Sequence, residues 1–359
     1  MLRVAVWGTG NMGSTAIRST TAFPGLELAS VITSSHDKAG RDAVEFAALD
    51  GKTGVAATTD VDAALAGCDA VAYMASGDIR PDDAVADIER CLRAGRHVVT
   101  PSLYSLYDPR SAPPEWVDRL TRAAEEGSST LLVSGVDPGW GNDALAVIAA
   151  GLCTRIKSIH CQEIFDYSTY NQPFAVKVSC GFGGSMDETP MMLLPSIPTM
   201  VWGGNIRLVG RNLGLDIDEI TEEVERRPLE ESVETVMGTF EKGTQGAFWL
   251  KVIGKSGGRE RIVIDHITRI HASCAPDWPY PDEGVGDHRV IIDGDPRLTI
   301  TTRADVPGGT RADGGNTTAA NRLLGALAWL VEQKPGIYDG LDVPLQTTLP
   351  REVQAQRWA

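Results

Sequence analysis

The glycines near the start of the chain have the spacing of a phosphate-binding turn. An apolar run at residues 2–7 leads directly into Gly8, Thr9, Gly10, Asn11, Met12 and Gly13, and a helical pattern follows. In such a strand-turn-helix the first glycine permits a tight bend, the second lets the backbone approach a pyrophosphate, and the third lets the helix pack against the strand. The free N–H groups of the helix N-terminus then attract the anion. We expect all six residues to bind a dinucleotide; an ordinary glycine turn is the alternative.

The end of the second apolar run distinguishes the two nicotinamide dinucleotides. An acidic residue there would accept a hydrogen bond from the ribose 2′-hydroxyl of NAD and would repel the 2′-phosphate of NADP. This chain has Ser34 and Ser35 at that place, and Lys38 and Arg41 follow within reach of a phosphate, although Asp37 lies among them. We therefore predict NADP(H) as the cofactor, with NAD(H) as the alternative.

Further cofactor contacts are expected where later strands end, because ligands of open parallel sheets bind beyond the carboxyl ends of the strands. Ser76 ends the apolar run 70–76 and Gly77 follows it, and Thr100 ends the run 97–100. For each of these residues a role in forming the turn, without ligand contact, is the alternative.

The candidates for moving a proton are Asp137, Tyr104 and Tyr167. Asp137 follows a predicted strand at the ligand edge of the sheet, where a carboxylate could act as general acid or base; an Asp-Pro-Gly turn that caps the next helix is the alternative. Tyr104 could donate to a reacting oxygen or could line a pocket. Tyr167 shares a predicted strand with Glu163 and Asp166, and we expect that strand to face the binding cleft.

The elements that must position these residues alternate in the first half of the chain. Near-continuous apolar runs, typical of parallel strands buried on both faces, are separated by stretches with apolar residues at every third or fourth position. This alternation predicts a Rossmann-type α/β fold, a doubly wound parallel sheet. The predicted strands cover residues 2–7, 26–33, 70–76, 97–100 and 130–136.

The pattern changes in the second half, where strands follow one another without helices between them. This predicts a second, α+β domain built on a mixed or antiparallel sheet, with strands at residues 155–167, 246–254, 259–270 and 289–303. An acid-rich segment, residues 216–231, has its apolar residues at helical spacing and is interpreted as a solvated helix. We expect a dinucleotide-binding domain over 1–145, a substrate and dimerisation domain over 146–315, and a C-terminal helix and tail, 316–359, that return to the cofactor domain.

Composition excludes several classes of partner. The 359 residues carry 33 Lys and Arg against 48 Asp and Glu, a net charge of −15, so neither nucleic acid nor a membrane surface is an expected partner. The apolar runs are far shorter than the roughly 20 residues of a membrane span, and the start of the chain reads as no secretory signal, so we expect a cytoplasmic protein. The six cysteines do not have the spacing of a metal site. His266 and His271 would point to opposite faces of one strand and so could not share a metal ion. We therefore expect no metal.

Several of these segments together resemble a known family. Residues 8–13, 34–45 and 134–142 (SGVDPGWGN), with 163–170 (EIFDYSTY) and 316–344, are similar to 2,4-diaminopentanoate dehydrogenase and the native NADP-dependent amine dehydrogenases, whose N-terminal domain is like that of dihydrodipicolinate reductase. The resemblance implies reductive amination of small ketones or aldehydes with ammonia, and the reverse deamination of primary amines. It also implies a homodimer joined through the second domain, with the substrate pocket between that domain and the nicotinamide.

The chain departs from the family at one position of chemical importance. Amine-forming members resemble one another in a pair of glutamates after the strand that ends at Thr100, and one of these carboxylates is taken to handle the amine proton. Leu103 and Tyr104 occupy that place here. Two alternatives therefore stay open: a reductase of another small metabolite that uses no ammonia, and a non-catalytic NADP-binding regulator.

Overall fold

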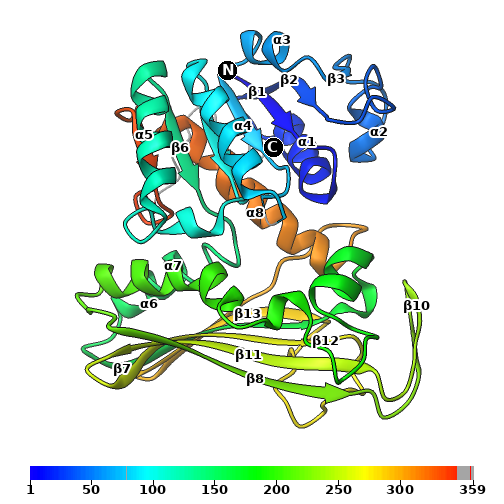
Figure 1. The fold of residues 1–359 in the computed structure, drawn as a ribbon, viewed down its shortest axis with the longest axis vertical. Helices are drawn as coiled ribbons and strands as arrows, with labels where there is room; N and C mark the ends of the chain where they lie inside the picture. Colours follow the sequence, from blue (N-terminus) through cyan, green and yellow to red (C-terminus); the bar gives the residue numbers. More distant parts are fainter. Residues whose placement is uncertain (78, 346–355, 357–359) are drawn as a thin grey trace. The chain divides into compact units, whose positions relative to one another are not determined.

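The computed structural model describes residues 1–77, 79–345 and 356 (Figure 1). The chain divides into two units, the first formed by residues 1–140 with 316–359 and the second by residues 141–315. The domain boundary expected after residue 145 lies inside helix α6 (Ala144–Ala150), which belongs to the second unit.

The first unit is built on a seven-stranded sheet in the order β15-β6-β5-β4-β1-β2-β3, with every described pairing parallel. All five predicted runs are strands of this sheet, because their side chains are buried between helices on both faces. The short strands β3 and β15 were not predicted. The bounds are β1 (Leu2–Trp7), β2 (Leu26–Ile32), β3 (Ala57–Thr58), β4 (Ala70–Tyr73), β5 (His97–Thr100), β6 (Thr130–Val133) and β15 (Gly336–Tyr338).

Helices cover both faces of this sheet, as a doubly wound fold requires (Figure 1). On one face, Ile17 of α1 (Asn11–Ala22) and Leu327 of α8 (Arg311–Leu330) belong to one apolar core with alternate residues of β1. The opposite core includes α3 (Val61–Ala66), α4 (Pro81–Arg93) and α5 (Pro114–Gly127). A short helix α2 (Val44–Ala47) and the 3₁₀ turn η1 (Tyr104–Tyr107) complete the unit.

The second unit is built on a six-stranded sheet in the order β14-β13-β7-β12-β11-β8. Only β7 and β12 pair in parallel, so the sheet is mixed, as predicted. Helices α6 and α7 (Ile197–Asn212) lie along one face of it, and β9 and β10 form a separate hairpin (Figure 1). The bounds are β7 (Arg155–Asp166), β8 (Glu219–Pro228), β9 (Val233–Thr235), β10 (Gly238–Phe240), β11 (Gln245–Ser256), β12 (Arg259–Arg269), β13 (Gly286–Asp295) and β14 (Leu298–Thr302); η2 (Tyr167–Thr169), η3 (Phe174–Ser179) and η4 (Met191–Leu193) are short helical turns.

The helix predicted over residues 216–231 is wrong, because most of that segment is the edge strand β8. Pairing with β11 overrides the helical spacing of the apolar residues, and the acids find partners across and beside the strand. Glu223 lies 3.4 Å from Lys251 of β11, and Glu222 accepts the Thr199 N–H at 2.8 Å in the first turn of α7. The acidic residues therefore hold the strand edge and the start of a helix.

Helix α6 has only seven residues, because turns occupy the residues before it. Helix α8 starts at Arg311, earlier than the predicted residue 316. Among the described helices, none has both the length and the apolarity that crossing a bilayer requires.

Candidate active site

The glycine-rich turn has the geometry that its sequence predicts. Gly8 has a φ of +125°, which favours glycine, and a Cβ there would approach the Met74 carbonyl carbon to 3.0 Å. A Cβ on Gly13 would lie 2.0 Å from the Gly8 carbonyl oxygen, so only glycine lets α1 start this close to the turn. Gly10 differs from both: it is exposed, and a Cβ on it would meet nothing within 4 Å. Gly8 and Gly13 are thus required by the fold, whereas Gly10 leaves open space in front of the turn.

The turn lies at the position where open parallel sheets of this kind generally bind ligands. Strand β1 has β2 on one side and β4 on the other, and the direction of winding reverses between β1 and β4. Gly10 is the N-cap of the 12-residue helix α1, with no side-chain group capping the first N–H groups. Asn11 and Met12 form the first turn of that helix and are partly buried. Open space, free N–H groups and the helix dipole together fit a dinucleotide pyrophosphate.

Lys38 reaches the glycine-rich turn, although 29 residues separate it from Thr9. Its Nζ donates to the Thr9 Oγ1 at 3.0 Å and to the Thr9 carbonyl oxygen at 3.4 Å. The Thr9 hydroxyl also lies 3.4 Å from that of Thr33, the residue after β2. The second strand therefore ends in a hydroxyl and an ammonium group at the place where an acid would select NAD.

The other predicted residues of this loop differ in position. The Arg41 guanidinium is half-exposed, pairs with Glu45 at 2.9 Å and lies over the Phe46 ring. Ser34 is exposed, and Ser35 is partly buried. Of the two predicted basic residues, Lys38 contacts the turn, whereas Arg41 contacts Glu45 and Phe46.

The end of β4 lies beside the end of β1, and the end of β5 lies beside that of β4, so all three strands end at the same edge of the sheet, as predicted. Ser76 is exposed there, whereas Gly77 is buried, with a Cβ position 3.0 Å from the Ser102 carbonyl oxygen. Thr100 is completely buried, and its hydroxyl donates to the Tyr73 carbonyl oxygen at 2.7 Å. Thr100 therefore supports the neighbouring loops with its side chain, and Ser76 is the more accessible of the three residues.

Asp137 lies in the turn after β6, partly buried, in the first unit. The turn is closed by the Trp140 N–H, which donates to the Gly135 carbonyl oxygen at 3.0 Å. The cap of the following helix is Asp143, whose carboxylate accepts the Ala144 N–H, so that role does not fall to Asp137.

Tyr104 lies at the start of η1, partly buried, with its ring centroid 6.2 Å from that of Tyr107. The Tyr107 ring is buried, and its hydroxyl donates to the Pro101 carbonyl oxygen at 3.2 Å. Leu103, one of the two residues at the family's glutamate positions, is 2 % exposed and belongs to the apolar core.

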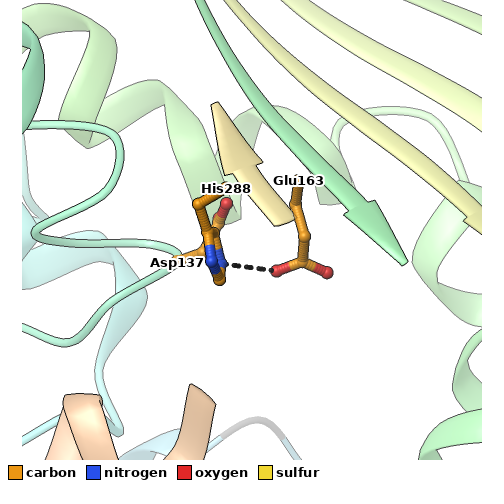
Figure 2. A group of neighbouring side chains, drawn as sticks. All are labelled: Asp137, Glu163 and His288. Atoms are coloured by element: carbon orange, nitrogen blue, oxygen red, sulfur yellow. Dashed lines mark ion pairs between the residues drawn. The ribbon is translucent and has the colours of Figure 1, made fainter. Parts of the chain in front are cut away.

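The second unit carries a row of three ionisable side chains across its sheet. Glu163 of β7 is in register with His266 of β12 on one side and with His288 of β13 on the other. The Glu163 Oε1 lies 3.6 Å from the His266 Nδ1, and its Oε2 lies 3.4 Å from the His288 Nε2; Figure 2 shows the latter pair as a dashed line. Asp137, also labelled there, belongs to the first unit. We call Glu163, His266 and His288 the Glu163 row.

Tyr167 adds a hydroxyl to this row. It donates to the Glu163 Oε1 at 3.3 Å. Burial, together with the Glu163 carboxylate, raises the pKa of Tyr167 well above its ordinary value. The phenol therefore stays protonated at neutral pH and acts toward Glu163 as a donor.

Asp166 does not join the row, contrary to the expectation for this strand. It is an odd number of residues from Glu163 and so lies on the opposite face. Its carboxylate is buried and accepts from the Ser168 N–H at 2.9 Å and from the Tyr280 hydroxyl at 3.0 Å. Asp166 therefore fixes the turn after β7.

Sequence reasoning named Glu163 and Tyr167 but missed His266 and His288 as their partners. The two histidines lie more than 100 residues along the chain from Glu163. They face it only because of how β12 and β13 pair with β7, and this pairing cannot be derived from one sequence. The available signal was that His266 lies on the strand predicted over residues 259–270 and that His288 immediately precedes the strand predicted over residues 289–303. A buried carboxylate between two imidazoles and a phenol can bind a cation and can accept or donate a proton.

Family models match both halves of the chain, and one relative matches almost its whole length. A family model described as the 2,4-diaminopentanoate dehydrogenase C-terminal domain matches residues 142–358, and one for the dihydrodipicolinate reductase N-terminus matches residues 2–100. An amine dehydrogenase of Streptomyces virginiae is 54 % identical over 354 residues, 98 % of each chain. A 2,4-diaminopentanoate dehydrogenase of Acetoanaerobium sticklandii is 23 % identical over 249 residues, 66 % of this chain and 64 % of its own. The structure of an amine dehydrogenase from Mycobacterium smegmatis has the same fold, with a TM-score of 0.77, 18 % identity and 97 % of each chain covered.

Proposed function

Because this chain belongs to the 2,4-diaminopentanoate dehydrogenase family, we propose that it is an NAD(P)H-dependent amine dehydrogenase. Its reaction is the reductive amination of small ketones or aldehydes with ammonia, and the reverse oxidative deamination of primary amines. The observation that carries this proposal is the 54 % identity to a curated amine dehydrogenase over almost the whole chain. The glycine-rich turn agrees with it, since the chain keeps the open space and free N–H groups that a dinucleotide needs.

The reaction sets definite tasks for the side chains. The ammonia nitrogen forms a bond to the carbonyl carbon while the C=O π pair moves to oxygen, and a proton passes from nitrogen to oxygen. Water leaves as the C=N bond forms. A nicotinamide held at the glycine-rich turn would supply the hydride that reduces this bond. The protein must hold the carbon in place, move the protons and exclude water.

We assign the oxygen side of this reaction to Asp137 and Tyr104. Both follow strands of the parallel sheet at its carboxyl edge, where ligands of such folds bind. The Asp137 carboxyl group protonates the leaving hydroxyl, and the Tyr104 hydroxyl donates to the same oxygen. In the second unit, Tyr167 is assigned the role of a donor, because its hydroxyl donates to the Glu163 carboxylate and stays protonated.

NADP(H) is the proposed cofactor in preference to NAD(H). Lys38 supports this assignment, because its ammonium group contacts the glycine-rich turn from the end of the second strand. An ammonium group there would pair with a 2′-phosphate. Arg41 can add a second positive charge once it leaves Glu45, and Ser34, Ser35 and Ser76 are the remaining proposed contacts. A homodimer joined through the second unit and a cytoplasmic location, where all six free thiols would stay reduced, complete the proposal.

An NADPH-oxidation assay tests the proposal. Small aldehydes and ketones are supplied with and without ammonium at alkaline pH, and oxidation should require both the carbonyl compound and ammonium. Turnover of the carbonyl alone would instead identify the ammonia-free reductase, which the apolar Leu103 at the family's glutamate position favours. Tight NADPH binding without turnover across the panel would indicate a regulator.

A further inference from the structure

We propose that the Glu163 row is the ammonium site of this enzyme, with the Glu163 carboxylate binding the ammonium ion and accepting its proton. This inference rests on the proposed amine dehydrogenase activity and assigns one step of it to named atoms. It concerns the second unit, where the sequence gives no motif for the reaction.

The first observation is that the row is built by the sheet and does not depend on flexible loops. Its three members come from the three adjacent central strands β13, β7 and β12, in direct register. Side chains at paired positions of neighbouring strands point to the same face. The carboxylate is therefore held between two imidazoles by the backbone pairing of the most deeply placed strands of the sheet.

The second observation concerns the hydrogen-bonding capacity of the carboxylate. An ionised carboxylate offers about four lone-pair positions. The Tyr167 hydroxyl uses one of them, at 3.3 Å, while the His266 and His288 nitrogens stand 3.6 and 3.4 Å away, beyond the usual 2.7–3.2 Å of an N–H···O bond. Glu163 can thus accept N–H donors from a small cation without giving up a short bond.

The third observation is the combination of burial and aromatic surroundings. Glu163 is 9 % exposed and His266 is 6 % exposed. The Trp202 ring lies 4.2 Å from the His266 ring, and the Phe165 ring lies 6.2 Å from the His288 ring and 5.7 Å from the Tyr167 ring. Aromatic faces attract cations, and the carboxylate supplies the opposite charge.

A purely structural role explains this arrangement less well. A buried ion pair seldom stabilises a fold more than apolar residues of the same size, because the desolvation of the charges offsets their attraction. The residues beside the row on the same strands, Cys161, Val290 and Ile264, are apolar and completely or almost completely buried. The face is therefore packed with apolar side chains on this side of the row, and a ligand would account for the three ionisable side chains that lie beside them.

The proposed step balances in atoms and charge. The ammonium ion donates one N–H proton to a Glu163 oxygen, which leaves neutral ammonia and a neutral carboxylic acid. The freed nitrogen lone pair forms the C–N bond, and Glu163 returns the proton to the nitrogen of the product amine, which leaves as an ammonium group. His266, His288 and Tyr167 are positioning residues that hold the carboxylate.

The test compares the variants E163Q and E223Q with the wild type in the ammonium-dependent assay. E163Q keeps the shape of the side chain but loses its charge, whereas Glu223 is an exposed glutamate on β8 that serves as the matched control. We expect E163Q to raise the KM for ammonium at least tenfold and to lower kcat about 100-fold. A loss of rate of about 100-fold is at the lower end of what removal of a general acid or base costs. The KM for the carbonyl compound and the Kd for NADPH should stay within about twofold, and E223Q should match the wild type.

Two further measurements keep the outcome decisive if E163Q folds poorly. In E163A, added formate should restore part of the ammonium-dependent rate, because it supplies the missing carboxylate; H288Q should raise the KM for ammonium less than E163Q does. An E163Q enzyme with wild-type KM for ammonium and kcat would overturn the inference. So would one divalent metal ion per purified chain that is lost in E163Q, because the row would then be a metal centre. If the wild type shows no dependence on ammonium, the proposed function itself fails. This result differs from an unaffected E163Q enzyme and from a bound metal ion, which would overturn only the inference about the Glu163 row.

Discussion

Replacing Gly10 by valine should separate cofactor binding from folding in a single substitution. Gly10 has a φ of −85° and a ψ of −163°, an extended conformation open to any residue, and its Cβ would meet no atom of the chain within 4 Å. The new isopropyl group would therefore extend into the open space that we assign to the pyrophosphate. The protein should therefore still fold with valine at this position, whereas cofactor binding should be lost.

The size of each effect follows from the structure. Valine is a poorer N-cap than glycine and costs α1 about 1 kcal/mol. The unfolded chain loses conformational freedom with valine, which returns about 0.4–1 kcal/mol. The net change in the free energy of unfolding should thus stay below about 1 kcal/mol, within the range of an ordinary surface substitution. The loss of the close approach to the pyrophosphate should weaken NADPH binding at least about 100-fold, equivalent to about 2.7 kcal/mol.

Fluorescence titration with NADPH and thermal unfolding together provide the assay, and Gly13→Ala is the contrasting variant. A Cβ on Gly13 would stand 2.0 Å from the Gly8 carbonyl oxygen, so this smaller change should destabilise the fold by about 1–3 kcal/mol. An unfolding midpoint lowered in Gly13→Ala but not in Gly10→Val is the expected pattern. NADPH affinity within about threefold of wild type in Gly10→Val would refute the reasoning about this turn.

Three other perturbations test separate residues. Lys38→Ala should raise the Kd for NADPH about 10- to 100-fold and leave the Kd for NADH nearly unchanged, because a charge-assisted bond to the 2′-phosphate contributes about 1.5–3 kcal/mol; equal losses for both cofactors would show that Lys38 only supports the turn. Asp42 accepts the N–H groups of Val44, Thr53 and Gly54 and the Thr53 hydroxyl, and these bonds lower its pKa from 3.8 to about 2. A lowered pKa in the folded state adds stability above pH 3.8 that is lost as the pH falls toward 2, so Asp42→Asn should have a lower unfolding temperature at pH 7 and a smaller acid-induced decrease; parallel curves would contradict this. Asp137→Asn should lower kcat about 100-fold with unchanged NADPH affinity if Asp137 protonates the leaving hydroxyl, and a wild-type rate would reduce it to a turn residue.

The cofactor half of the fold could be predicted because its signals are local. Strands buried on both faces have continuous apolar runs, and the tasks of Gly8 and Gly13 are set by atoms of the same turn. The sequence also indicated that Lys38 follows the second strand near the glycine-rich turn, although it did not predict the contact with Thr9. Local sequence was sufficient wherever one β-α-β unit contains the whole feature.

The second half could be predicted only in part because its structure depends on pairing between distant strands. The segment that includes Glu222 and Val224 has helical spacing, yet it is an edge strand because β11 offers it a partner. Helix α7 was missed, since its glycines and its weakly amphipathic pattern hide it. The partners of Glu163 were missed because His266 and His288 meet it only through the register of three strands, and one sequence does not contain that register.

The return of the chain to the first sheet has a consequence for how the protein is made. Strand β15 pairs with β6, and α8 contributes Leu323, Leu324, Leu327 and Leu330 to the core that β1 and α1 share. The ribosome makes the entire second unit before it makes these residues. Until then, one face of the first sheet is covered by α1 but lacks α8, and the edge of β6 is unpaired. The second unit can therefore fold before the first unit is complete, and the first unit can complete its core only after α8 has been synthesised and has docked.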